Sequence, residues 1–262
     1  MLKALVKKQL MEIFRTYLYD TKKNRSRSRG RILFSFILFG FLMVGVLGGV
    51  FAGLSIAICA PLNSAGMGWM YFMLIGVLAV FLGAFGSVFN TYSGLYLSKD
   101  NDLLLALPIP VRTIMSARLM GVYLMGLMYS AVVSVPAVIV YLCVASFSAS
   151  ALIGGVVYVF MISLFVMVLS CALGWAVAKI SLKLKHKSFM TVVLSLAFIG
   201  LYYFFYFKAQ EVIADVVANA AVYGTAIRAK FQPLYVFGNA ATGDWASIAL
   251  FSAFTLILFA IT

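Results

Sequence analysis

Long apolar runs separated by short polar segments dominate the chain. The runs cover residues 32–60, 69–97, 114–144, 151–178, 189–207 and 246–262. A helix needs about 20 apolar residues to cross the hydrocarbon core of a bilayer. The first five runs reach that length, and the last, which extends to the final residue, is marginal. The pattern predicts an all-α polytopic membrane protein with about six transmembrane helices, in which residues 32–262 form the transmembrane domain.

A second kind of helical pattern precedes the first run. Residues 2–18 carry apolar side chains at three- and four-residue steps, and Lys, Glu and Arg side chains take most of the other face. This spacing is typical of an amphipathic helix that lies in the membrane interface. Residues 1–31 are therefore expected to form an interfacial helix followed by a basic anchor.

The same periodicity recurs in the long segment 208–245, between the fifth and sixth runs. Val212, Val216 and Ala220 fall on one helical face, and polar side chains spaced by four fall on the other. An amphipathic helical excursion on the outer surface is therefore predicted. Pro233, Gly238 and Gly243 are expected to interrupt the helix before the last run.

Basic residues are distributed unevenly between the connecting segments. The N-terminal segment holds ten Lys and Arg, the segment 98–118 three and the segment 179–188 four, whereas the alternate segments hold none, none and three. Because cytoplasmic loops carry the excess of Lys and Arg, the N-terminus is predicted to be cytoplasmic. The excess of basic residues on one side is expected to contact anionic lipids. This asymmetry accounts for the net charge of +13, so no nucleic acid is expected as a partner.

Composition narrows the functional classes. The chain is 65% hydrophobic and 10% charged, which excludes a soluble globular domain and a disordered chain. No acidic, basic or His residue occurs between Arg31 and Lys99, between Arg118 and Lys179 or between Lys187 and Lys208, so an ion-coupled carrier and an intramembrane enzyme are both disfavoured. The single histidine, His186, lies in a basic loop, and no metal site is predicted. We therefore expect no catalytic residues.

Two stripes of small residues interrupt the apolar runs. Gly45, Gly49 and Gly53 are spaced by four in the first run, and Gly83 lies in a similar stripe in the second. Small residues at this spacing let helix backbones approach closely. Packing between helices of this chain is favoured over a dimer contact.

The segment between the second and third runs has an unusual composition. Lys99, Asp100 and Asp102 precede a leucine-rich stretch at 103–107, and Pro108 and Pro110 then stop any helix. By the charge distribution this segment is cytoplasmic. An apolar turn on that side either folds back onto lipid or docks a soluble partner.

Residues 98–120 resemble the coupling segment of ABC-2 type transporter permeases. In that family an acidic residue, a Leu-rich turn and an L-P-x-[SP] step join the second and third spans. Asp100 and Asp102 are the two candidates for the acidic position, and residues 107–110 stand at the step. The layout of spans also resembles the family, and residues 231–245 resemble a sequence in larger bacterial exporters that continue with a further hydrophobic half. The chain is therefore expected to be an N-terminal portion of a longer one.

The resemblance implies a permease subunit of an ABC exporter in the bacterial cytoplasmic membrane, with no enzymatic activity of its own. The chain contains no G-x-x-x-x-G-K-[ST] motif, so a separate ABC ATPase would bind the ATP and Mg²⁺, and no cofactor is expected on this chain. A second permease half would come from the continued chain or from a homo- or heterodimer. The residues implied in ATPase docking, within the coupling segment 98–113, are Lys99, Asp100, Asp102, Leu103, Leu104, Leu105, Leu107, Pro108, Pro110 and Arg112.

Two questions stay open at this level. A non-catalytic membrane scaffold or a sensor domain fits the same layout, because a fold does not determine a function. The apolar spans are compatible with lipids, hydrophobic peptides or drugs as substrates, and the sequence does not choose between them.

Overall fold

The structure is a computed structural model that describes residues 2–14, 18–20, 25–96, 106, 108–145, 147–183, 196, 200, 203, 204, 208, 211, 215, 216 and 218–262. Apart from one antiparallel pair of two-residue strands, β1 (Tyr19–Asp20) and β2 (Arg25–Ser26), the ordered elements in these residues are helical. The helices are α1 (Leu2–Ile13), α3 (Arg29–Gly40), η1 (Phe41–Leu47), α4 (Gly48–Ser64), α5 (Gly68–Thr91), η2 (Tyr92–Tyr96), α7 (Val111–Val144), α8 (Ala149–Lys183), α10 (Ala220–Lys230), α11 (Gln232–Asn239), η3 (Ala240–Thr242) and α12 (Trp245–Ile261).

Four helical stretches among the described residues are long and apolar enough to cross a membrane: Arg29–Ser64, Gly68–Tyr96, Val111–Val144 and Ala149–Lys179. A fifth is counted if the pair Gln232–Thr242 and Trp245–Ile261, bent by 117°, forms one span. These helices confirm the prediction of an all-α membrane protein. Most of the predicted span at 189–207 lies outside the described residues, so the total of six stays a prediction.

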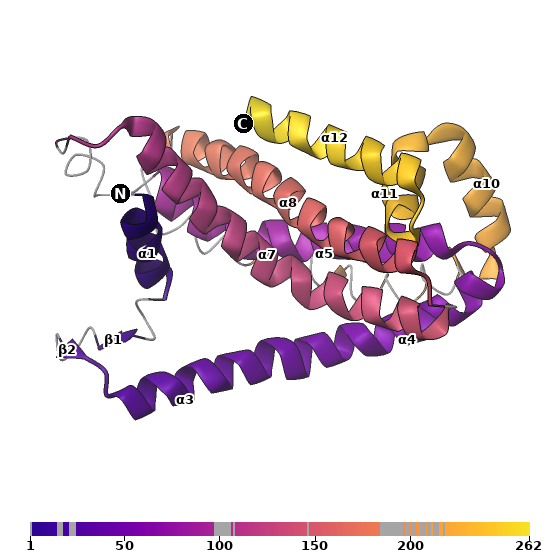
Figure 1. The fold of residues 1–262 in the computed structure, drawn as a ribbon, viewed down its shortest axis with the longest axis horizontal. Helices are drawn as coiled ribbons and strands as arrows, with labels where there is room; N and C mark the ends of the chain where they lie inside the picture. Colours follow the sequence, from indigo (N-terminus) through magenta and orange to yellow (C-terminus); the bar gives the residue numbers. More distant parts are fainter. Residues whose placement is uncertain are drawn as a thin grey trace.

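Helices α5, α7 and α8 form the centre of the bundle (Figure 1). Small side chains line their contact. A Cβ atom at Gly83 of α5 would lie 2.9 Å from the methyl groups of Val166 and 3.3 Å from the Cβ of Ser130. The hydroxyls of Ser130 and Ser163 are 3.0 Å apart, which joins α7 to α8. Gly83 thus lies where backbones approach closely, which is the role that small residues have at membrane helix contacts.

The first long helix lies apart from this centre over much of its length. Helices α3 and η1 diverge from the other helices in Figure 1. Added Cβ atoms at Gly49 and Gly53 would meet nothing within 4 Å, and one at Gly45 would meet only the ring of Phe41 in the same helix. Within the described chain, these three glycines therefore lack the interhelical contact that the sequence predicted for them.

Helix α1 packs across the beginning of α7. The two helices approach closely at Gly121, where an added Cβ atom would lie 2.8 Å from the Cγ of Gln9. The ring of Phe14 also lies 5.5 Å from that of Phe36 in α3. The bundle therefore has one end marked by α1 and an opposite end marked by α10 and α11 (Figure 1).

The α10–α11 end of the bundle differs in part from the outer helical segment that the sequence predicted for residues 208–245. The helix does break just before Pro233, because α10 ends at Lys230 and α11 begins at Gln232. Gly238 does not interrupt the helix, because it lies within α11. Proline is compatible with the first turn of a helix, whose N–H groups have no partner within the helix. Gly238 lies so close to α5 that an added Cβ would clash with the carbonyl oxygen of Trp69. Gly243 does interrupt the helix, with a left-handed φ of 98° after η3.

Candidate functional site

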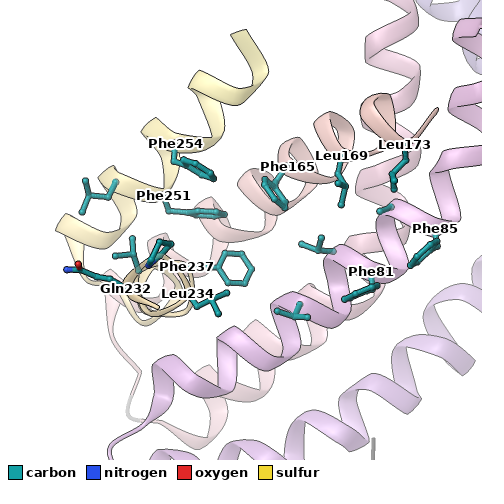
Figure 2. A pocket seen from close by; sticks show the side chains of 16 residues that line it. Phe81, Phe85, Phe165, Leu169, Leu173, Gln232, Leu234, Phe237, Phe251 and Phe254 are labelled. Carbon is teal, nitrogen blue, oxygen red and sulfur yellow. The ribbon is translucent and has the colours of Figure 1, made fainter. Parts of the chain in front are cut away.

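A groove with a volume of about 910 Å³ lies between α5, α8, α11 and α12 (Figure 2). This volume falls within the range of ligand pockets in proteins, roughly 300–1,000 Å³. One lining residue, Gln232, is polar, and the others are apolar. The lining consists of Val77, Val80, Phe81, Ala84, Phe85, Phe165, Leu169, Leu173, Gln232, Pro233, Leu234, Val236, Phe237, Leu250, Phe251 and Phe254.

The two walls of the groove are helix faces. On α5 the lining residues recur at steps of three and four from Val77 to Phe85, and on α8 Phe165, Leu169 and Leu173 recur at steps of four. Such spacings place side chains on one side of a helix. In Figure 2 Phe81 and Phe85 lie across the groove from the α8 residues. Each wall is therefore held by a helix that also packs in the centre of the bundle.

Helix α11 closes one end of the groove through aromatic contacts. The ring of Phe237 lies 5.2 Å from Phe251 of α12 and 5.3 Å from Tyr158 of α8. The Tyr158 hydroxyl in turn donates a hydrogen bond of 2.6 Å to the carbonyl oxygen of Phe72 in α5. These contacts connect α5, α8, α11 and α12 at the closed end.

The sharp bend between α11 and α12 depends on two close approaches to α8. A Cβ atom at Gly154 would lie 2.8 Å from the carbonyl oxygen of Ala240 and 3.0 Å from the backbone of Gly243. A Cβ atom at Gly243 would lie 2.6 Å from the carbonyl carbon of Ser150. Glycine at these positions lets the backbone of the bend rest directly on the first turns of α8.

Asp244 holds the first turn of α12 at the bend. Its carboxylate accepts hydrogen bonds from the backbone N–H of Ser247 at 3.0 Å, the Ser247 hydroxyl at 2.6 Å and the Asn239 side-chain amide at 3.1 Å. Bonds from the hydroxyl and N–H of Ser247, followed by that from Asn239, lower the pKa of Asp244. The residue is an N-cap whose ionised form is favoured.

Positive charge gathers near the closed end of the groove. Arg228 and Lys230 lie in the last turn of α10, just before Gln232, and the Arg228 guanidinium lies 5.0 Å from the centre of the Tyr235 ring. Two carboxylates lie in the same region: Asp215 accepts a hydrogen bond from Tyr223 of α10, and Asp244 accepts one from Asn239 of α11. The arrangement can accept an apolar chain inside and an anionic group beside its rim. It presents no nucleophile, acid or base to a substrate.

The predicted docking segment is described only at its end. Lys99, Asp100, Asp102, Leu103, Leu104, Leu105 and Leu107 lie outside the described residues. Pro108, Pro110 and Arg112 are exposed. Pro110 precedes the first turn of α7, and its carbonyl accepts a hydrogen bond of 2.9 Å from the Thr113 N–H. The prolines therefore lead directly into α7, and neither they nor Arg112 line the groove.

The sequence did not indicate the groove. Its wall residues have the same apolar periodicity as lipid-facing positions such as Val156 and Phe160, both of which are exposed on α8. Gln232 is the polar residue of the lining, but no motif around it in the sequence marked it as a site residue. Only Gly243 signalled the bend that brings α11 into place.

No cluster of three or more His, Cys, Asp or Glu side chains suited to a metal ion occurs within the described residues. Cys59, Cys143 and Cys171 are unpaired thiols. Comparison of the chain with protein families, curated proteins and solved structures gives no match in any of the three. A functional assignment for this chain therefore depends on its own sequence and geometry.

Proposed function

We propose that the chain is the membrane-spanning permease subunit of an ATP-driven ABC exporter. The observation that carries the proposal is the apolar groove between long membrane helices, because it offers a binding site with no chemical machinery. The resemblance of residues 98–120 to the coupling segment of ABC-2 permeases supports the ATP-driven form of transport. The sequence contains no phosphate-binding loop motif, which is compatible with the proposed hydrolysis of ATP by a separate subunit.

The path from the coupling segment to the groove runs along α7. This helix begins directly after Pro110 and continues to Val144, a rise of about 51 Å at 1.5 Å per residue. It packs extensively on α5 and α8, which form the two walls of the groove. In the proposed cycle, ATP binding moves the coupling segment, α7 moves with it, and the separation of α5 and α8 changes. Substrate in the groove is thereby released.

The proposed orientation places α1 and the start of α7 on the cytoplasmic side. The excess of Lys and Arg in the N-terminal segment and in 179–188 supports this orientation. The bundle end with α10 and α11 would then face outward in a bacterial cytoplasmic membrane. The proposed assembly contains a second permease half and two ATPase subunits.

The docking role of the 103–107 stretch can be tested by charge insertion. Leu104→Asp and Leu105→Asp place a carboxylate where an apolar side chain is proposed to enter a groove on the ATPase, which desolvates the charge at a cost. We expect each variant to insert normally into the membrane. The amount of ATPase that co-purifies with it should be at least ten-fold lower than with the native chain. Leu184→Asp, in the other predicted cytoplasmic loop, is the matched control and should retain the partner.

The result that contradicts this docking is specific. If Leu104→Asp and Leu105→Asp both retain the partner as well as Leu184→Asp does, the apolar stretch is not the docking element.

A further inference from the structure

We propose that the groove binds one acyl chain of an anionic amphiphile and that such a molecule is the substrate class of the exporter. This inference rests on the proposed function for the transport step. The binding step itself rests on the groove alone.

The shape of the groove fits an extended chain. Its walls run from Val77 to Phe85 on α5 and from Phe165 to Leu173 on α8, and each wall rises by about 12 Å. Helix α11 closes one end, and Figure 2 shows Phe251 and Phe254 of α12 along the third side. The groove is therefore an elongated slot enclosed by three helices and closed at one end.

The chemistry of the slot requires an apolar occupant along its length. A polar group placed among these side chains would lose its hydration without gaining a hydrogen-bond partner. The rim residues Phe81, Leu250 and Phe254 are more than half exposed, at 51%, 60% and 55%. The slot thus opens sideways, toward the region that the acyl chains of a bilayer occupy. An acyl chain can enter from there without crossing a polar layer.

The closed end supplies a place for a charged headgroup. Gln232 is the polar residue of the lining, and Lys230 and Arg228 precede it in the last turn of α10. Asp215 and Asp244 lie in the same region, but their carboxylates accept hydrogen bonds from Asn219 and Tyr223 and from Asn239 and Ser247, respectively. Among the described residues, neither carboxylate forms a salt bridge with Arg228 or Lys230. Basic residues at the membrane surface attract anionic lipids. Charge complementarity therefore favours an anionic headgroup at this end over a neutral or cationic one.

The test is photolabelling of the purified chain in phospholipid vesicles with a diazirine-bearing fatty acid, followed by mapping of the labelled peptides. We expect labelling of the α5 and α12 groove peptides to exceed labelling near Val156 and Phe160, on the exposed face of α8, at least five-fold. Ala84→Phe should reduce groove labelling to that background by filling the slot. Leu250→Trp obstructs the exposed rim and should also reduce groove labelling. It provides an independent test if Ala84→Phe fails to fold. Ile139→Trp, at an exposed position of α7 outside the groove, is the matched control and should label normally.

A second arm tests the headgroup. Lys230→Glu should reduce labelling by the ionised fatty acid at least three-fold and leave labelling by its uncharged methyl ester unchanged. Equal labelling by the fatty acid in Lys230→Glu and in the native chain overturns the anionic headgroup.

Three results overturn the acyl-chain site as a whole. The first is uniform labelling of groove and background. The second is groove labelling that persists in both Ala84→Phe and Leu250→Trp. The third is efficient crosslinking between two chains through cysteines at positions 81 and 254 in a chain without native cysteines, which would show that a second copy fills the slot.

The photolabelling needs no ATPase, so the two proposals fail separately. Failed labelling in a chain that still recruits an ATPase overturns the acyl-chain inference alone. Specific labelling in a chain that recruits no ATPase supports the binding site and overturns the assignment of its ligand as an exporter substrate.

Discussion

Gly154 is the position where the bend between α11 and α12 depends most directly on one missing side chain. In Gly154→Ala, the new Cβ would lie 2.8 Å from the carbonyl oxygen of Ala240 and 3.0 Å from the N and Cα atoms of Gly243. All three are backbone atoms, so no change of rotamer relieves the contact. Helix α8 and the bend must move apart instead.

The expected cost follows from comparison with a glycine that has free space. Overpacking of a tight contact costs about 1–3 kcal/mol, whereas alanine in a helix gains up to about 1 kcal/mol over glycine. Gly53→Ala receives the same gain without the clash, since nothing lies within 4 Å of its added Cβ. We therefore expect Gly154→Ala to be less stable than Gly53→Ala by about 1–3 kcal/mol.

The assay is unfolding of both purified variants in mild detergent by titration with a denaturing detergent, followed by circular dichroism. The displaced bend should also widen the closed end of the groove, so Gly154→Ala should lose groove photolabelling while Gly53→Ala retains it. Equal stability and equal labelling of the two variants would refute the close contact of the bend with α8.

The cap and the serine contacts give two further predictions. Asp244→Ala should lower the free energy of unfolding at pH 7 by about 1 kcal/mol, and Asp244→Asn by less, because the amide oxygen still accepts the Ser247 N–H. Since the folded-state pKa of Asp244 is lowered, its ionic stabilisation is complete above the unfolded pKa of about 4 and disappears as the pH falls through the folded pKa. The difference between Asp244→Ala and the native chain should therefore shrink in acid, and a difference independent of pH would contradict the ionised cap. The buried hydroxyls of Ser87 and Ser170, 2.6 Å apart, should show a coupling of about 0.6–1.7 kcal/mol in a double-alanine cycle of unfolding free energies, whereas strictly additive losses would show that this hydrogen bond contributes nothing.

The sequence predicted the four long spans within a few residues. The third was expected at 114–144 and observed at Val111–Val144, and the fourth was expected at 151–178 and observed at Ala149–Lys183. This agreement has a simple cause. The thickness of the bilayer sets the length that an apolar helix needs, and the length and hydropathy of each run can be read from the sequence alone.

The packing of these helices was harder to predict. Gly53 and Gly83 have the same four-residue spacing to other small residues, yet only Gly83 lies against other helices in the described structure. A stripe of small residues permits a close approach, but it does not specify a neighbour. Within a membrane a lipid-facing side chain and a buried one are equally apolar, so hydropathy does not separate them.

The α11 helix shows a second limit of local rules. Pro233 and Gly238 both disfavour helix interiors, and the sequence therefore predicted breaks at each. In the structure the chain does break before Pro233, which lies in the first turn of α11. Gly238 lies inside that helix against Trp69, so at this residue tertiary contact outweighs the local preference. The groove depends on the contact of α11 with α5. The sequence does not reveal this contact, so it could not reveal the groove.

The most direct test of the proposed function is purification of the tagged protein from native membranes in mild detergent, with mass spectrometry of its partners. We expect a stoichiometric partner that carries a phosphate-binding loop, together with ATPase activity in the isolated complex. A preparation that contains no such partner, even after crosslinking in intact membranes, would contradict the assignment of this chain as the permease subunit of an ABC exporter.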